Sequence, residues 1–91
     1  MKMYTTPEQT AKLIELGFEK PKTKLPFEVA NDELGYTYSI GELIEMLPEC
    51  TIVSMKTWHI VQYDKEHYYG RNELIDALYF LIVELKENKI I

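Results

Sequence analysis

The sequence contains one cysteine, Cys50, and two histidines, His59 and His67, among 91 residues. A single cysteine excludes an internal disulfide and an all-cysteine metal site. No spacing of Cys, His, Asp or Glu matches a known metal signature, and nothing in the sequence brings Cys50, His59 and Asp64 together as a nucleophile. We therefore expect no metal, no cofactor and no enzymatic activity.

Positive charge is also scarce, because fifteen acidic residues outnumber ten basic ones and give a net charge of −5. Binding to a nucleic-acid backbone needs clustered Lys and Arg, so a nucleic-acid partner is not expected. No apolar run resembles a signal peptide or a membrane span, which predicts a cytoplasmic protein. The length predicts one domain, residues 1–91, with a modest core.

The longest stretch with a helical period covers residues 72–88. Its apolar residues share one face at 100° per residue, and no other segment can cover as much apolar surface. We expect Asn72 to cap its first turn and Asn88 to take the left-handed conformation that often closes a helix. The residues of this apolar face are Leu74, Ile75, Ala77, Leu78, Leu81, Ile82 and Leu85.

Two apolar residues, Phe80 and Val83, fall on the polar side of this helix. Either another element of the fold covers them, or they are exposed for a partner, because large exposed apolar patches are uncommon on monomers. The second alternative predicts a homodimer through Phe80 and Val83.

Two shorter helices are predicted before it by their capping boxes. Thr6 caps the first, with Pro7 at its first position and Gln9 completing the box, and Gly17 ends it with Phe18 packing back. The second begins at Ser39, with Glu42 three residues on, and ends before Pro48. Residues 19–35 are irregular, with a short extended piece at 27–29 and a turn at 31–32.

Residues 51–70 have the pattern of a β-meander. If residues 56–57 form a two-residue turn, Met55 faces Trp58 and Val53 faces Ile60 on one side of a hairpin. A third strand at 67–69 follows a turn at 64–65, and Gly70 is expected to end it. The predicted fold is α+β: two short N-terminal helices, a two- to three-stranded antiparallel β-meander, and a long C-terminal helix packed on the sheet.

The most suggestive polar patch is Tyr68, Tyr69 and Arg71, just ahead of the long helix. Two aromatics and a cation next to a helix N-terminus can stack a base or bind an anion, and Trp58 is expected nearby. These four residues predict a site for a small anionic, nucleotide-like ligand. The alternative is that the tyrosines pack at the edge of the core.

Three stretches carry a resemblance: LIELGFEKP at 13–21, YSIGELIEMLP at 38–48, and ELIDALY at 73–79 with LKEN behind it. Together they resemble small uncharacterised proteins of gut Bacteroidota and of their phages and mobile elements. The resemblance implies an accessory gene of phage or mobile-element origin. It brings no assigned activity and no functional residues.

The sequence thus predicts a small non-enzymatic protein that acts through protein–protein contacts, with a second copy of itself or another protein. The alternative is a protein that binds or sequesters a nucleotide-like ligand, for example in phage counter-defence.

Overall fold

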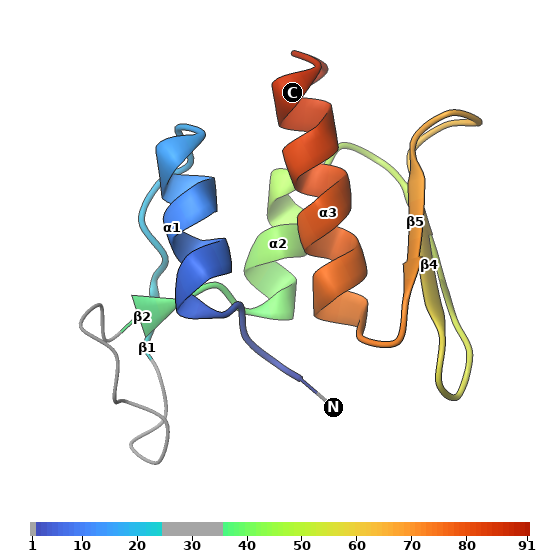
Figure 1. The fold of residues 1–91 in the computed structure, drawn as a ribbon, viewed down its shortest axis with the longest axis horizontal. Helices are drawn as coiled ribbons and strands as arrows, with labels where there is room; N and C mark the ends of the chain where they lie inside the picture. Colours follow the sequence, from blue (N-terminus) through green and yellow to red (C-terminus); the bar gives the residue numbers. More distant parts are fainter. Residues whose placement is uncertain (1, 25–35) are drawn as a thin grey trace.

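The computed structural model describes residues 2–24 and 36–91 of the chain (Figure 1). The extended piece and the turn expected at 27–29 and 31–32 lie outside the described residues. The elements are, in order, α1 (Pro7–Glu15), β1 (Thr23–Lys24), β2 (Tyr36–Thr37), α2 (Ile40–Met46), β3 (Thr51–Ser54), β4 (His59–Gln62), β5 (Tyr68–Arg71) and α3 (Leu74–Glu87). The α+β class and the order of the elements are confirmed.

Helix α3 lies between the sheet of β3, β4 and β5 on one side and the other two helices on the other (Figure 1). Its apolar residues are buried on both sides, and each fully buried Leu or Ile contributes about 1.5–3 kcal/mol. The buried core consists of Leu13, Tyr38, Leu43, Val61, Ile75, Ala77, Leu78, Leu81, Ile82 and Leu85. The seven α3 residues predicted to form the apolar face are all in this core or packed against it.

Both capping boxes form as predicted. The Thr6 hydroxyl accepts from the Gln9 N–H at 3.1 Å, and the Gln9 side chain accepts from the Thr6 N–H at 3.0 Å. Ser39 and Glu42 make the same reciprocal pair at the start of α2. Each box satisfies two backbone donors that a helix start otherwise leaves free.

Helix α1 ends at Glu15 with Leu16 as its C-cap, and Gly17 follows as the predicted stop. Gly17 has φ of 103°, and its N–H donates to Ile14 O at 3.0 Å, while the Phe18 N–H donates to Leu13 O at 3.2 Å. This pair of bonds defines a Schellman motif, in which glycine takes the left-handed conformation without a steric penalty.

Both predicted ends of α3 are wrong by one residue. The N-cap is Glu73, not Asn72, and its side chain makes no cap bond to the helix. Instead, the Glu73 carboxylate accepts from the Lys2 N–H at 2.8 Å, a contact 71 residues away in the sequence. At the other end Lys89, with φ of 59°, takes the left-handed position expected for Asn88, whose amide donates to Glu84 O instead.

The three-stranded sheet has the predicted hairpin register. Val53 pairs with Ile60, and the Met55 N–H donates to Trp58 O at 2.8 Å, which closes the two-residue turn. Strand β5 pairs with β4 with Tyr69 opposite Val61. The prediction that Gly70 ends this strand is wrong. Gly70 lies within the strand, opposite Ile60.

A second, two-stranded sheet of β1 and β2 was not predicted. It forms because the strand at 36–37 pairs with residues 23–24, and no local sequence pattern signals a pairing between segments so far apart. Residues 2–4 are tied to the rest of the domain. Lys2 Nζ binds Asp76 Oδ1 at 2.7 Å, and Tyr4 forms a β-bridge with Ser39.

Three buried threonines join the N-terminal segment, α1 and β2. The Thr5 hydroxyl lies 2.7 Å from that of Thr10 and 2.6 Å from that of Thr37, and it accepts the Tyr38 N–H at 3.1 Å. Buried hydroxyls cost free energy unless they are hydrogen-bonded, and here each has a partner. The cluster therefore fixes the first residues against the body of the domain.

Two glycine substitutions, one in the Schellman motif and one in α2, are predicted to have opposite effects on stability. Gly17→Ala should lower the free energy of unfolding by about 1–2 kcal/mol, because an L-residue is strained at that φ although there is room for its Cβ. Gly41→Ala, in the first turn of α2 with only Ser39 Oγ nearby at 3.9 Å, should raise it by about 0.5–1 kcal/mol. Urea unfolding of both variants measures this. Equal effects of the two changes would contradict the assignment of the motif.

Candidate functional site

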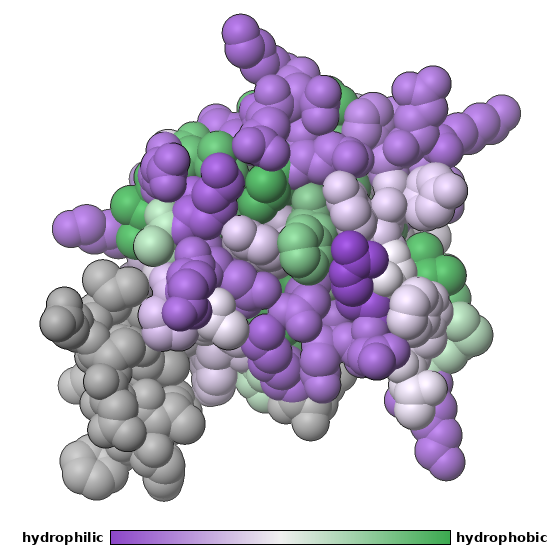
Figure 2. Space-filling view, in the orientation of Figure 1, coloured by the Kyte–Doolittle hydropathy of each residue, from purple (hydrophilic) through white to green (hydrophobic). Residues whose placement is uncertain are grey.

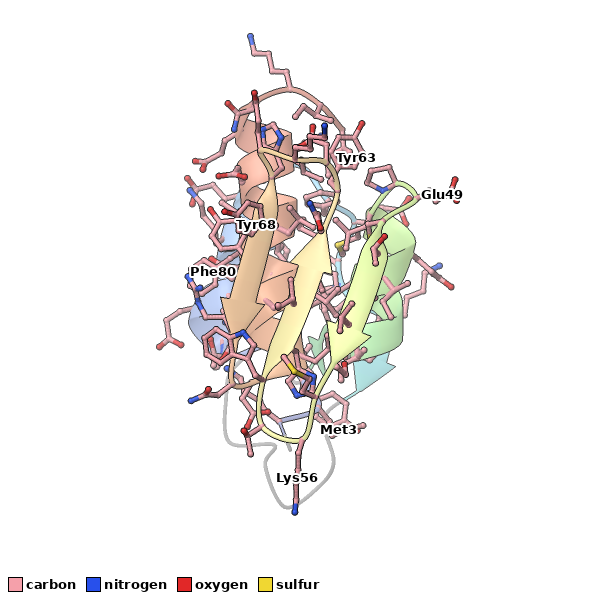
Figure 3. The ribbon with its side chains drawn as sticks, turned by 90° about the vertical axis from the view of Figure 1, so that its right-hand side faces the viewer. Met3, Glu49, Lys56, Tyr63, Tyr68 and Phe80 are labelled. Atoms are coloured by element: carbon pink, nitrogen blue, oxygen red, sulfur yellow. The ribbon has the colours of Figure 1, made fainter. Side chains whose placement is uncertain are left out.

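The outer face of the three-stranded sheet points away from α3 and carries a group of exposed apolar side chains (Figure 3). These are Val53 at 48% exposed, Met55 at 53%, Trp58 at 41% and Tyr68 at 58%. Figure 2 shows apolar surface on the side of the molecule where the sheet lies. Within the described residues, no helix covers this face (Figure 1).

Trp58 lies flat across the outer face because Gly70 has no side chain. A Cβ built at Gly70 would sit 2.9 Å from Trp58 Cζ2 and from Trp58 Nε1, closer than real contacts allow. A glycine inside a strand often marks such a close approach. The indole of Trp58 therefore gives the outer face a large, flat, apolar aromatic surface.

Strand β3 is exposed on both of its faces and not only on the outer one. All four of its residues, Thr51–Ser54, are exposed, and Ile52, which points toward the helix side, is 36% exposed. Helix α3 packs mainly against β4 and β5. We call the exposed apolar side chains of Ile52, Val53, Met55 and Trp58 the β3 surface.

The four residues predicted to bind a ligand do not line one pocket. Tyr68 and Trp58 are on the outer face of the sheet, whereas Tyr69 and Arg71 face α3. Successive residues of a strand point to opposite faces, so Tyr68 and Tyr69 cannot face the same site while β5 stays regular. Tyr38 is 1% exposed and belongs to the core.

Tyr69 and Arg71 instead cover Phe80. The Arg71 guanidinium carbon lies 4.7 Å from the centroid of the Phe80 ring, and the Tyr69 ring stacks on that ring at 5.9 Å. Phe80 remains 38% exposed, and Val83 packs against the core. Of the two alternatives stated for these residues, the structure favours partial cover by another element.

The electrostatics of this cluster do not suit an anion. The Tyr69 hydroxyl donates to Glu84 Oε1 at 3.0 Å, which places a carboxylate beside the aromatic rings. Burial, followed by this bond to Glu84, raises the pKa of Tyr69. The Arg71 guanidinium also donates to Gly70 O at 2.7 Å, so part of its hydrogen-bonding capacity is used within the chain.

The two histidines lie at opposite ends of the sheet and do not approach each other. His59 pairs with Arg71 in the register, whereas His67 lies beyond the Gln62–Tyr68 pair. His59 is buried, with Nδ1 2.9 Å from Ser54 Oγ. Among the described residues, no group of His, Cys, Asp and Glu could hold a metal ion.

Cys50 is half-buried, and burial raises the pKa of its thiol, which disfavours a nucleophilic thiolate. Burial also affects the carboxyl of Asp76. Burial would raise the pKa of its carboxyl, but bonds from Lys2 Nζ and Gln9 Nε2 outweigh burial and lower it. The bonds from Lys2 and Gln9 explain the environment of Asp76.

The larger surface hollow, of about 690 Å³, lies under the hairpin turn where α3 begins. It is lined by Lys56, Thr57, His59, Asn72 and Glu73. Its lining mixes one lysine with one glutamate, so it presents no single charge to a ligand. None of Trp58, Tyr68, Tyr69 and Arg71 contributes to it.

No protein-family model matches this chain, and no curated protein or solved structure matches it. Within residues 2–24 and 36–91, no helix is both long enough and apolar enough to span a lipid bilayer. Sequence patterning correctly placed Val53, Met55 and Trp58 on one face, but gave no signal that β3 would lack cover on its other face.

The contact of Trp58 with Gly70 predicts a spectroscopic change. Gly70→Ala should displace the indole toward solvent, shift the fluorescence of this only tryptophan to longer wavelength, and destabilise the fold by about 1–3 kcal/mol through overpacking. Fluorescence emission and urea unfolding measure both effects. The control is Gly41→Ala, where a Cβ has room; an unchanged emission spectrum in Gly70→Ala would refute the contact.

The turn between β4 and β5 predicts a shifted histidine titration. His67 Nδ1 lies 2.8 Å from Asp64 Oδ1, and this bond raises the pKa of His67 above 6.5 and lowers that of Asp64 below 3.8. The pairing therefore stabilises the fold between these two values. It weakens as pH rises through the folded-state pKa of His67, or falls through that of Asp64. In NMR titrations, Asp64→Asn should lower the midpoint of His67 toward 6.5; no change would contradict the pairing.

Proposed function

We propose that this chain is a small non-enzymatic interaction protein that binds a protein partner through the β3 surface. The observation that carries this proposal is the exposure of β3 on both faces, with the apolar residues Ile52, Val53 and Met55 in or next to it. Exposed apolar patches of this kind are characteristic of interaction sites.

Trp58 extends this surface as a rigid aromatic contact. Its indole is held in place by Gly70 and is still 41% exposed. Large aromatic side chains supply much contact area at a low cost in conformational entropy, and tryptophan is enriched among the residues that dominate binding energy. The surface therefore has an anchor residue and flanking aliphatic side chains.

The alternatives stated from the sequence receive less support. Phe80 is partly covered by Arg71 and Tyr69, so the helix side offers less free apolar surface than β3. A site for a small anionic ligand would need Tyr68 and Tyr69 on one side of the sheet, and they lie on opposite sides. An origin in a phage or mobile element of Bacteroidota stays a prediction.

Photo-crosslinking in cells that naturally express the chain tests the proposal. A benzophenone amino acid in place of Met55, which is 53% exposed, should give protein adducts on irradiation. The same amino acid in place of Met3, which is 50% exposed and lies outside the sheet, should give few. This pair matches residue type and exposure.

A third position, Phe80, separates the β3 surface from the helix side. Adducts from Met55 but not from Phe80 support the proposal. Adducts from Phe80 alone, or none from Met55, contradict it. The mass of each adduct then shows whether the partner is a second copy or a different protein.

A further inference from the structure

The backbone of β3 has a free edge in the described structure. The Met55 N–H donates to Trp58 O, so Met55 belongs to a hydrogen-bonded pair of the β3–β4 ladder. Such pairs alternate along antiparallel strands, which makes Val53–Ile60 the next hydrogen-bonded pair. The N–H and C=O groups of Ile52 and Ser54 therefore point away from β4, and β3 is the outermost strand in the order β3-β4-β5.

This edge lacks most of the features that usually protect exposed strands, although at four residues it is short. Natural edge strands carry charges, prolines or bulges, or are covered by a helix or loop. Strand β3 is Thr51–Ser54, TIVS, without a charge or a proline, and its register with β4 is regular. An unprotected regular edge with apolar side chains is a template for another strand.

We propose that the strand that pairs with this edge is β3 of a second copy of the chain. The two copies pair edge to edge and antiparallel, and their sheets join into one sheet of six strands. This inference deepens the proposed function and rests on it, because it names the partner of the β3 surface. The copies are related by a two-fold axis perpendicular to the sheet, which keeps both outer faces on the same side. Such an interface uses the same patch from each copy.

The backbone pattern limits the register to two arrangements. Faces match only when residues of equal parity oppose each other, so either Ile52 lies opposite Ile52 of the second copy, or Val53 lies opposite Val53. In both arrangements the outward N–H and C=O groups of Ile52 and Ser54 meet such groups of the other copy. Ile52, which is 36% exposed on the face that points toward the helices, then gains neighbours from the second copy.

Charges at the two ends of β3 favour the antiparallel arrangement. Glu49 lies at one end of the strand and Lys56 at the hairpin turn at the other end (Figure 3). Antiparallel pairing brings Lys56 of each copy to the end that carries Glu49 of the other. Exposed ion pairs add little affinity, but charge complementarity sets orientation and register.

The area suits a dimer of moderate affinity. Ile52, Val53 and Met55, which lie on the pairing strand or at its end, are 36%, 48% and 53% exposed and leave on the order of 250 Å² of apolar side chain uncovered per copy. Trp58, in contrast, packs toward Gly70 of β5 and away from this edge. Specific interfaces bury about 600–1,000 Å² per partner. The apolar side chains supply the centre, and the strand backbones with their polar neighbours supply the remainder.

Sedimentation velocity over a range of concentrations tests the pairing, with variants matched in exposure. Ile52 is 36% exposed and Phe80 is 38% exposed. The wild type should show a reversible monomer–dimer equilibrium. Ile52→Lys should raise the dimer dissociation constant by roughly tenfold or more, because it sets like charges close together at the two-fold axis. Phe80→Lys, and Tyr68→Lys on the opposite edge strand, should leave the constant near the wild-type value.

A cysteine variant keeps the proposal falsifiable even if Ile52→Lys fails to fold. In a Cys50→Ser background, Ile52→Cys or Val53→Cys should form a disulfide-linked dimer under mild oxidation, since directly opposed strand residues have the Cα separation that a disulfide needs. Tyr68→Cys should not. The position that links faster identifies the register.

The two proposals fail in different ways. A wild type that stays monomeric at high concentration, with no disulfide at either position, overturns the second-copy inference. The second-copy inference is also overturned if Phe80→Lys or Tyr68→Lys dissociates the dimer while Ile52→Lys leaves it intact. If Met55 still crosslinks to a different protein in cells, the proposed function stands while this inference falls. Absence of any adduct from Met55 overturns both.

Discussion

The burial of α3 on two sides is the constraint on which the remaining structure depends. The helix is apolar over most of its circumference, and no single neighbour can cover it. The sheet covers one side and α1 and α2 cover the other, so a three-layer arrangement follows from the pattern of one helix (Figure 1). Even its polar arc is used, because Asp76 binds Lys2 and Gln9, and Glu84 binds Tyr69.

The same constraint explains why one strand lacks cover. A helix with its side chains is about 10–12 Å across, while neighbouring strands are about 4.8 Å apart, so one helix covers about two strands. Helix α3 lies over β4 and β5, and β3 extends past it. The third strand completes the hairpin that the sequence specifies, but the chain supplies no helix for its inner face within the described residues. The β3 surface is thus a geometric result of placing one helix on three strands.

The features that could be predicted from the sequence are those with local causes. The capping boxes at Thr6 and Ser39 each depend on residues three positions apart, and the hairpin register depends on alternation along two adjacent strands. The misplaced features depend on distant residues. Asn72 does not cap α3, because Glu73 is the N-cap and turns its carboxylate toward the Lys2 N–H. Gly70 stays in its strand because Trp58 needs the space above it.

The candidate site shows the same limit in another form. Tyr68 and Tyr69 were grouped because they are adjacent in the sequence, although strand alternation alone sends them to opposite faces. The exposure of Ile52 could not be predicted, because it depends on how far across the sheet α3 extends and not on the residues of β3. Burial of a strand face is a property of the packed layers, and the sequence of that strand does not encode it.

The buried threonines have a consequence for the motions of the native state. Thr5, Thr10 and Thr37 belong to three separate segments, and their hydroxyls satisfy one another only while all three segments are docked. Detaching one segment would take one hydrogen-bond partner from each of the other two hydroxyls and open their apolar setting to water. The N-terminal segment, α1 and β2 should therefore open together as one cooperative unit, with amide protons that exchange with solvent at a common rate, while the helix and sheet behind them remain closed.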